Sequence, residues 1–340
     1  MILLTGANGH LGANLLRQLL REGADVRVLL RPRRDNSTVA GLPVDHAFGD
    51  LRDPESLARA LRGCSHVYHT AAMVALHNRG QEIFEHNVIG TKNLLRAAMG
   101  AGVAKVVVSG SLSAVGYVPG QPSDESMPFN PFEAHMPYAF SKAGVEQECL
   151  KAAADGLNVV VAISCAILGP WDFKPSRMGR VLVDFANGRM LAYIPGGFEF
   201  VTARDIAAGH MLAMDKGRSG QRYIFGSGFR SVDDLMATYQ RVTGRARPIR
   251  IPAGLMAAVA RVSSFVLTHC RPDVPQRFTP ASVRLLRMER RADCTRAREE
   301  LGYRPTSIED AIQAAYDWFV ERGAIRRPAA VAVREVRVDS

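Results

Sequence analysis

The sequence predicts an α/β fold built on a doubly wound parallel sheet, with a smaller α/β substrate lobe towards the C-terminus. Short apolar runs alternate with helix-patterned stretches over the first half of the chain, a glycine-rich turn follows the first run, and the alternation ends after Pro170. A chain of 340 residues, 47% of them hydrophobic, is long enough to bury a large core.

The expected strands are short runs of mainly apolar residues, at 2–5, 25–30, 67–70, 105–109 and 157–163. Helix patterns lie between them, at 11–22, 54–61, 88–101 and 138–154. Asp53 followed by Pro54 is a typical helix start, because aspartate caps free N–H groups and proline fits the first turn. Strands that alternate with helices imply a parallel sheet covered on both faces, whose ligands collect at the carboxyl ends of the strands.

Beyond Pro170 the pattern becomes rich in loops. We expect a helix at 203–215, a strand at 222–225, and two helices opened by capping boxes, Ser231 with Asp234 and Thr306 with Glu309. An apolar segment at 255–267 is too short to span a bilayer and contains Arg261, so a lobe or lid helix is expected there.

These elements divide the chain into two expected units and a tail. Residues 1–170 form the nucleotide-binding domain, to which the helix at 203–215 returns. Residues 171–202 and 216–324 form the substrate-binding lobe. Residues 325–340 are a basic tail.

Composition narrows the function classes. The formal charge of +10 is spread along the chain without a nucleic-acid-binding motif, so no nucleic-acid partner is expected. The five cysteines are scattered and odd in number, which is typical of a reducing compartment. The first strand starts at the initiator methionine and leaves no room for a signal peptide, so a cytoplasmic location is expected. The nearby histidines His66, His69 and His77 lack further ligands at metal spacing, so no metal site is predicted.

The first chemical motif is the turn from Gly6 to Gly12, which also contains Asn8, Gly9, His10 and Leu11. It follows a strand and opens a helix, so the backbone can turn tightly and approach a pyrophosphate at the helix N-terminus. This placement predicts a dinucleotide cofactor.

Basic residues follow the second strand, where NAD-binding folds usually carry an acidic residue for the ribose 2′-hydroxyl. Arg31 and Arg34 stand there instead, with Arg33 between them. Guanidinium groups pair strongly with phosphate. The sequence therefore favours NADP(H) over NAD(H).

Further cofactor contacts are expected at the ends of the third and fourth strands. Asp50 and Leu51 follow the third, where Asp50 can accept from the adenine amino group. Thr70, Ala71 and Ala72 follow the fourth, and the small alanines allow the cofactor to lie against the backbone.

A proton-transfer site is expected where the fifth strand ends in Ser111 and a helix begins at Tyr138. Lys142 lies four residues after Tyr138, on the same helical face. A free tyrosine has a pKa of roughly 10. We expect the Lys142 ammonium and an oxidised nicotinamide to favour the phenolate and lower the pKa of Tyr138 towards neutrality.

With these motifs the chain resembles an extended short-chain dehydrogenase/reductase over nearly its whole length, and most of all the branch of dihydroflavonol 4-reductases and hopanoid-associated sugar epimerases. The glycine turn resembles the TGxxGxxG loop, Asn87 to Thr91 the NVxGT helix start, and Tyr138 with Lys142 the YxxxK pair. The resemblance implies a Rossmann-type domain and a homodimer formed through the helices around Val88 and Tyr138.

The resemblance also implies roles for single residues. Ser111 is the catalytic serine, with Ser113 as the fallback, and Asn87 holds a water in the proton path. Ser109, Cys165 and Ile167 lie on the cofactor side. Apart from the resemblance, the candidates for the substrate pocket are Leu76, Ser113, Tyr117, Trp171 and Phe173, each of which could equally be a core or loop residue. Departures are Gly110, where serine or threonine is usual, and Ser164-Cys165, where proline is frequent; they put the substrate in doubt.

Three function classes remain open. The first is a reductase or dehydrogenase that interconverts a ketone or aldehyde and an alcohol on a largely apolar small molecule. The second is a sugar-nucleotide epimerase or dehydratase, in which the cofactor stays bound. The third is a non-catalytic dinucleotide sensor, which would not need Ser111, Tyr138 and Lys142 together.

Overall fold

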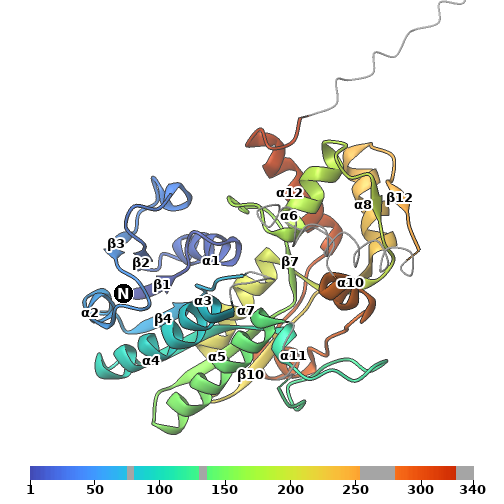
Figure 1. The fold of residues 1–340 in the computed structure, drawn as a ribbon. Coiled ribbons are helices and arrows are strands. Elements are labelled where there is room, and N and C mark those ends of the chain that lie inside the picture. Colours follow the sequence, from blue (N-terminus) through green and yellow to red (C-terminus); the bar gives the residue numbers. More distant parts are fainter. Residues whose placement is uncertain (75–79, 130–135, 253–279, 327–340) are drawn as a thin grey trace, which may run out of the picture.

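A computed structural model describes residues 1–74, 80–129, 136–252 and 280–326. Its centre is a parallel sheet of seven strands in the order β10-β6-β5-β4-β1-β2-β3 (Figure 1). The sheet consists of β1 (Ile2–Thr5), β2 (Val26–Leu30), β3 (Asp45–Phe48), β4 (His66–His69), β5 (Lys105–Ser111), β6 (Val159–Ser164) and β10 (Arg222–Phe225). The predicted doubly wound, Rossmann-type α/β fold is confirmed.

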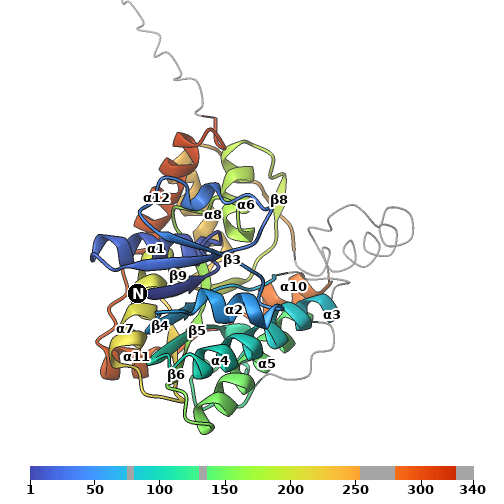
Figure 2. The same ribbon diagram turned by 90° about the vertical axis from the view of Figure 1, so that its left-hand side faces the viewer.

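Helices cover both faces of this sheet (Figure 2). On one face α1 (His10–Arg21) packs against α7 (Ala203–Lys216), and on the other α4 (Gly90–Gly100) packs between α2 (Pro54–Ala60) and α5 (Pro137–Ala154). A short helix α3 (Gly80–Phe84) and a π-helical stretch, Glu85–Ile89, lead into α4. Asp53 caps α2 as predicted, accepting from the N–H groups of Glu55 and Ser56.

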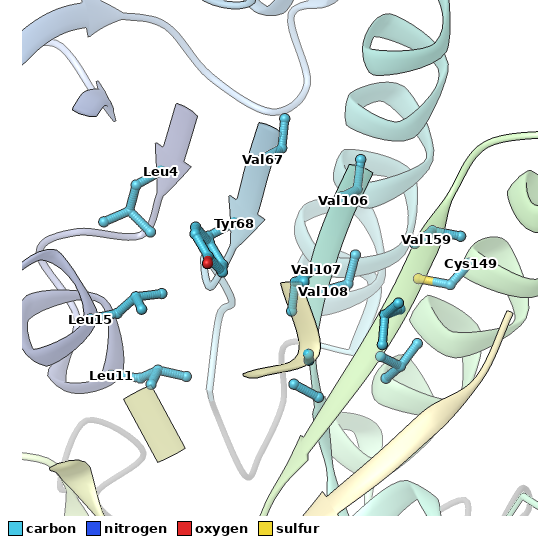
Figure 3. Close-up of a cluster of buried hydrophobic side chains, with 14 of the residues drawn as sticks. Leu4, Leu11, Leu15, Val67, Tyr68, Val106, Val107, Val108, Cys149 and Val159 are labelled. Atoms are coloured by element: carbon cyan, nitrogen blue, oxygen red, sulfur yellow. The ribbon is translucent and has the colours of Figure 1, made fainter. Parts of the chain in front are cut away.

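The main core lies around the middle of β5 (Figure 3). Val106, Val107 and Val108 are fully buried, because helices cover both faces of this central strand. Leu15 from α1 and Cys149 from α5 complete the two layers. The strand then changes from valines to Ser109-Gly110-Ser111, so its polar groups emerge at the carboxyl edge of the sheet.

A second core holds the smaller lobe together. Its three-stranded sheet has the order β11-β9-β7 and is packed by three helices; the elements are β7 (Ala166–Leu168), β9 (Gly197–Thr202), β11 (Gly228–Ser231), α6 (Arg177–Ala186), α8 (Val232–Thr243) and α12 (Ile308–Glu321). Phe185, Phe200, Tyr239 and Phe319 are buried among these elements. A two-stranded pair, β8 (Ala192–Tyr193) with β12 (Ile249–Arg250), and the helices α10 (Pro280–Arg287) and α11 (Thr295–Leu301) complete the lobe side.

The expected domain division is wrong at three elements. The strand β10 was expected in the lobe but pairs with β6 in the large sheet, and α11 packs on β10 and α7. The strand β7, expected in the nucleotide-binding unit, pairs with β9 in the small sheet. Short buried strands look alike in sequence, so their partners are decided by tertiary packing rather than by local pattern.

One capping box is confirmed and the other is wrong. Ser231 and Asp234 cap α8 reciprocally. At α12 the cap is Ser307, whose side chain accepts from the N–H of Asp310. Thr306 instead donates its N–H and hydroxyl to the two carboxylate oxygens of Asp205, at 2.7 and 2.9 Å.

Asp205 is 3% exposed and lies in the first turn of α7. Its carboxylate also accepts from the hydroxyl of Ser227 at 2.8 Å. One buried side chain therefore joins α7, the turn after β10 and the start of α12.

Several expectations fall outside the described residues, namely the helix at 255–267, Leu76, His77 and most of the basic tail. No helix in the described part of the chain is long and apolar enough to cross a bilayer.

Candidate active site

The glycine turn lies at the carboxyl end of β1, against the end of β4. Gly6 has a φ of +80°, and a Cβ there would lie 2.5 Å from the backbone nitrogen of Ala71. A Cβ on Gly12 would overlap the carbonyl oxygen of Gly6. A Cβ on Gly9 would meet only that same oxygen, at 3.3 Å. Gly6 and Gly12 are therefore required by the fold, whereas Gly9 leaves open space beside the loop.

This open space fits a dinucleotide. Gly9 is the N-cap of α1, no side chain in the described ranges caps the helix, and its first turn contains no acidic residue. The Oδ1 atom of Asn8 is buried without a hydrogen-bond partner among the described residues, while its Nδ2 donates to Asn36. Free N–H groups at a helix N-terminus attract a pyrophosphate.

The predicted phosphate-binding arginines follow β2. Arg31, Arg33 and Arg34 are exposed, and within the described structure none pairs with a carboxylate. Asp35, which follows Arg34 in the chain, lies 3.7 Å from Lys174. Arg31 and its neighbours thus remain available to a 2′-phosphate.

Asp50 already has a partner at the predicted adenine side. Arg52 donates to both carboxylate oxygens at 2.9 and 3.1 Å, and this pairing lowers the pKa of Asp50 to about 2. Leu51 packs against Gly90, and the hydroxyl of Thr70 donates to the carbonyl oxygen of Thr5. The adenine contact of Asp50 stays a prediction.

Ser111 and Tyr138 meet at the carboxyl edge of β5. The Ser111 side chain is close enough to affect the pKa of the Tyr138 phenol, and the hydroxyl of Ser113 lies 2.9 Å from that of Ser111. Burial raises the pKa of Tyr138, and the Ser111 hydrogen bond and the charge of Arg177 oppose that rise. The expected joint effect of Lys142 and an oxidised nicotinamide on this pKa stays a prediction.

Lys142 is directed instead to β5, where its Nζ donates to the carbonyl oxygen of Ser109 at 2.7 Å. It is 4% exposed, and burial lowers its pKa to about 8. The hydroxyl of Ser109 lies 2.7 Å from Nε2 of His210. Nδ1 of His210 donates to the carbonyl oxygen of Ile206 at 2.8 Å, so Nε2 is the acceptor and His210 fixes the Ser109 side chain.

Asn87 lies in the π-helical stretch and is 1% exposed. Its Oδ1 accepts from the N–H of Met73, and its Nδ2 donates to the carbonyl oxygen of Met73 and to the hydroxyl of Ser141. Both amide hydrogens are used, so the side chain holds the segment after β4 against α5. Its role with a water stays a prediction.

His69, which was not predicted as a site residue, connects the end of β1 to the π-helical stretch that contains Asn87. His69 accepts at Nδ1 from the hydroxyl of Thr5 at 2.7 Å and donates from Nε2 to Thr91 at 2.9 Å. Thr91 in turn donates to the carbonyl oxygen of Asn87. Burial lowers the pKa of His69 to about 3, so it stays neutral.

The predicted substrate residues are dispersed. Tyr117 donates to the carbonyl oxygen of Met288 at 2.8 Å. Trp171 and Phe173 stack on each other, and Trp318 of α12 meets Trp171 at a tilt and Phe173 edge to face. The guanidinium of Arg17 on α1 lies 4.2 Å from the Trp171 ring centroid. Their contacts are thus with α1 and α12 rather than with Tyr138. Their substrate role stays a prediction.

Cys165 and Ile167 follow β6. Cys165 is 7% exposed and burial raises the pKa of its thiol, whereas Ile167 is half-buried in β7. Both lie past the Ser111–Ser164 register pair of β5 and β6, on the side where the cofactor is expected.

Comparison with known proteins decides the family. Residues 2–226 match the NAD dependent epimerase/dehydratase family. The chain belongs to this family. Within it, the chain is an extended short-chain dehydrogenase/reductase, as the glycine turn and the Tyr138–Lys142 pair predicted.

Two relatives match over nearly the whole chain. The Sterol demethylase protein B of Methylococcus capsulatus is 43% identical, with 95% of this chain and 99% of that protein covered. A putative dihydroflavonol 4-reductase of Synechocystis is 35% identical, with 95% of each covered.

Two solved structures support the same fold. The crystal structure of gox2253 superposes with a TM-score of 0.84 at 33% identity, over 96% of this chain and 99% of that one. A dTDP-glucose 4,6-dehydratase of Streptomyces venezuelae, solved with NAD, gives a TM-score of 0.77 at 26% identity, over 95% and 98%. The chain is therefore an NAD(P)-dependent enzyme of the extended short-chain dehydrogenase/reductase type.

Proposed function

We propose that this enzyme is an NADPH-dependent reductase or dehydrogenase that interconverts a ketone or aldehyde and an alcohol on a largely apolar small molecule. The observation that carries the proposal is the meeting of Ser111 and Tyr138 at the carboxyl edge of β5, one helical turn from the buried Lys142. The glycine turn follows β1 at the same carboxyl edge of the parallel sheet.

The cofactor supplies the hydride, and the turn from Gly6 to Gly12 would hold its pyrophosphate. Arg31 and Arg34 would pair with the 2′-phosphate. Ser111 and Tyr138 hydrogen-bond the substrate oxygen, and Tyr138 gives the proton in the reducing direction. Burial keeps the Tyr138 phenol protonated at neutral pH, which suits a proton donor. Lys142 would hold the nicotinamide ribose.

Two observations support an apolar substrate. The relative named Sterol demethylase protein B aligns with almost the entire chain, lobe included. The residues after β2 also lack the acid that NAD-dependent sugar-nucleotide enzymes usually carry. We therefore include alicyclic and steroid ketones among the test compounds.

We also propose a homodimer that pairs α4 and α5 with their copies. Ile89, Met99, Phe140 and Leu150 on or beside these helices are large apolar side chains between 37% and 49% exposed. Such side chains are more stable when a partner covers them. Sedimentation analysis of the purified protein tests this assembly.

The function is tested by calorimetric titration with NADPH and NADH, followed by assays of NADPH oxidation with aliphatic, aromatic and steroid ketones. We expect tighter NADPH binding and substrate-dependent oxidation, with kcat lowered roughly 10²- to 10⁴-fold in Tyr138→Phe. A cofactor that stays bound without net turnover would support the epimerase or dehydratase instead. Unchanged function in Tyr138→Phe would support the sensor.

A further inference from the structure

A buried carboxyl group lies beneath the proton-transfer site. Glu146 is on α5, one helical turn after Lys142, and is 1% exposed. Its Oε2 accepts from Nη1 of Arg222 on β10 at 3.3 Å, while its Oε1 is buried with no hydrogen-bond partner among the described residues. Removing a carboxylate from water costs several kcal/mol unless a cation compensates.

The Oε1 atom of Glu146 lies beside Gly110 of β5. A Cβ on Gly110 would lie 3.2 Å from this oxygen and 2.8 Å from carbon atoms of Val161 and Ile163. Gly110 stands between Ser109, whose carbonyl oxygen holds Lys142, and Ser111, which contacts Tyr138. The absence of a side chain at Gly110 is what allows the carboxyl group of Glu146 to approach β5 at this point.

We propose that Glu146 is a positioning residue that keeps Lys142 charged and held against Ser109, with Arg222 fixing the carboxylate from the opposite side. The proposal rests on the proposed function for the role of Lys142 in catalysis, but the pairing itself is a property of the folded chain.

Among the described groups near Lys142, Glu146 is the one that can carry a negative charge, because the others are neutral. Cys149 is on the same helix, and burial raises the pKa of its thiol, so it stays neutral. His69 on β4 and His210 on α7 both have pKa values lowered by burial, to about 3 and about 4, and are also neutral. Burial lowers the pKa of Lys142 to about 8, and Glu146 acts against this fall.

The carboxyl group of Glu146 is affected by Lys142 in return. Burial raises the pKa of Glu146 to about 7, and the charges of Arg222 and Lys142 act against that rise. Arg222 also donates to the carbonyl oxygens of Glu125 and Met127, which fixes its guanidinium beside the carboxylate. A neutral glutamine at 146 would remove the anion and leave two buried or half-buried cations.

The kinetic test compares wild type, Glu146→Gln and the matched control Glu148→Gln across pH 6–9.5, with kcat/KM in the reducing direction and the Kd for NADPH as readouts. Without the carboxylate the pKa of Lys142 falls, so we expect the alkaline limb of both profiles to move down by about one pH unit. Glu148 is on the same helix and pairs with the exposed Lys151, so its variant should follow wild type. A Glu146→Gln profile that superimposes on wild type would overturn the proposal.

A second variant, Glu146→Asp, keeps the charge at this position. We expect its alkaline limb to stay nearer wild type than that of the glutamine variant. If the glutamine variant does not fold but the aspartate variant folds with a nearly normal limb, the need for a charge is supported. If both variants shift the alkaline limb of the pH profile equally, the negative charge at position 146 is not the cause and the proposal fails.

A test on the protein without cofactor separates this inference from the proposed function. The change in unfolding free energy caused by Glu146→Gln is measured at pH 8 in the wild-type and Lys142→Met backgrounds. We expect Glu146→Gln to destabilise the protein more when Lys142 is present, because the ion pair with Arg222 is lost in both backgrounds but the attraction between Glu146 and Lys142 is lost only in the first. Equal effects in both backgrounds would refute the pairing, even if NADPH turnover is found. A clear coupling without turnover would leave the pairing intact and refute only the reductase.

Discussion

The substitutions Gly9→Ala and Gly12→Ala should separate cofactor binding from folding. A Cβ on Gly12 would overlap the carbonyl oxygen of Gly6 and lie 2.8 Å from the hydroxyl of Thr70. Overpacking against a backbone atom costs about 3 kcal/mol, the upper end of the usual range, and alanine returns about 1 kcal/mol through its helix propensity. The net loss for Gly12→Ala is therefore about 2 kcal/mol.

Unlike Gly12, Gly9 has room for a Cβ. Its Cβ would meet only the carbonyl oxygen of Gly6 at 3.3 Å, and its φ of −88° suits any residue. Replacing this N-cap glycine with alanine should cost less than about 1 kcal/mol of stability. The added methyl group occupies the space reserved for the pyrophosphate, so NADPH affinity should fall at least about tenfold, equivalent to about 1.4 kcal/mol.

Urea unfolding and NADPH titration of both variants provide the assay. We expect Gly12→Ala to lose stability, and Gly9→Ala to keep its stability and lose affinity. If Gly9→Ala binds NADPH like wild type, the pyrophosphate does not approach this loop and the assignment of the cofactor cradle is wrong. If Gly12→Ala is as stable as wild type, the close approach to Gly6 has been misjudged.

Three further predictions concern other parts of the molecule. Arg31→Ala should weaken NADPH binding by about 1.5–3 kcal/mol, the usual value for a charge-assisted hydrogen bond, and leave NADH binding unchanged. Equal losses of affinity for both cofactors in calorimetry would contradict the role of Arg31 in binding the 2′-phosphate. Arg177→Gln should raise the pKa of Tyr138, because the arginine charge favours the phenolate. The acidic limb of the pH profile for alcohol oxidation then moves to higher pH. An equal shift in the control variant Arg180→Gln would argue against a specific effect of Arg177. Ser307→Ala should lower the unfolding free energy by about 1 kcal/mol through loss of the α12 cap, more than the same change at the exposed Ser126.

The local motifs could be predicted because their residues are close in sequence. Glycines three residues apart after a strand, and Tyr138 four residues before Lys142 at a helix start, fix their own geometry through the strand-to-helix turn and the helical repeat. The capping box at Ser231 was predictable for the same reason. At α12 two hydroxyl residues are adjacent, and the contact of Thr306 with the distant Asp205 decided which one caps the helix.

The residues that tune the site could not be found in this way. Glu146 and Arg222 are 76 positions apart, and Ser109 and His210 are 101 apart, so each pair depends on the order of strands in the sheet. Glu146 does have a sequence signal, since a glutamate one turn after Lys142 on a largely buried helix face needs a counter-charge. The pKa of Tyr138 also required the structure, because burial raises it and the distant Arg177 lowers it, and neither effect follows from the local spacing.

The carboxylate of Asp205 limits how this enzyme can open to admit a ligand. It holds the turn after β10 and the start of α12 to α7, a helix of the nucleotide-binding side, through three hydrogen bonds of 2.7–2.9 Å. Opening the molecule at this seam would break all three hydrogen bonds, and hydrogen bonds to charged groups are worth about 1.5–3 kcal/mol each. We therefore expect the two units to stay joined at this seam when the enzyme admits a ligand.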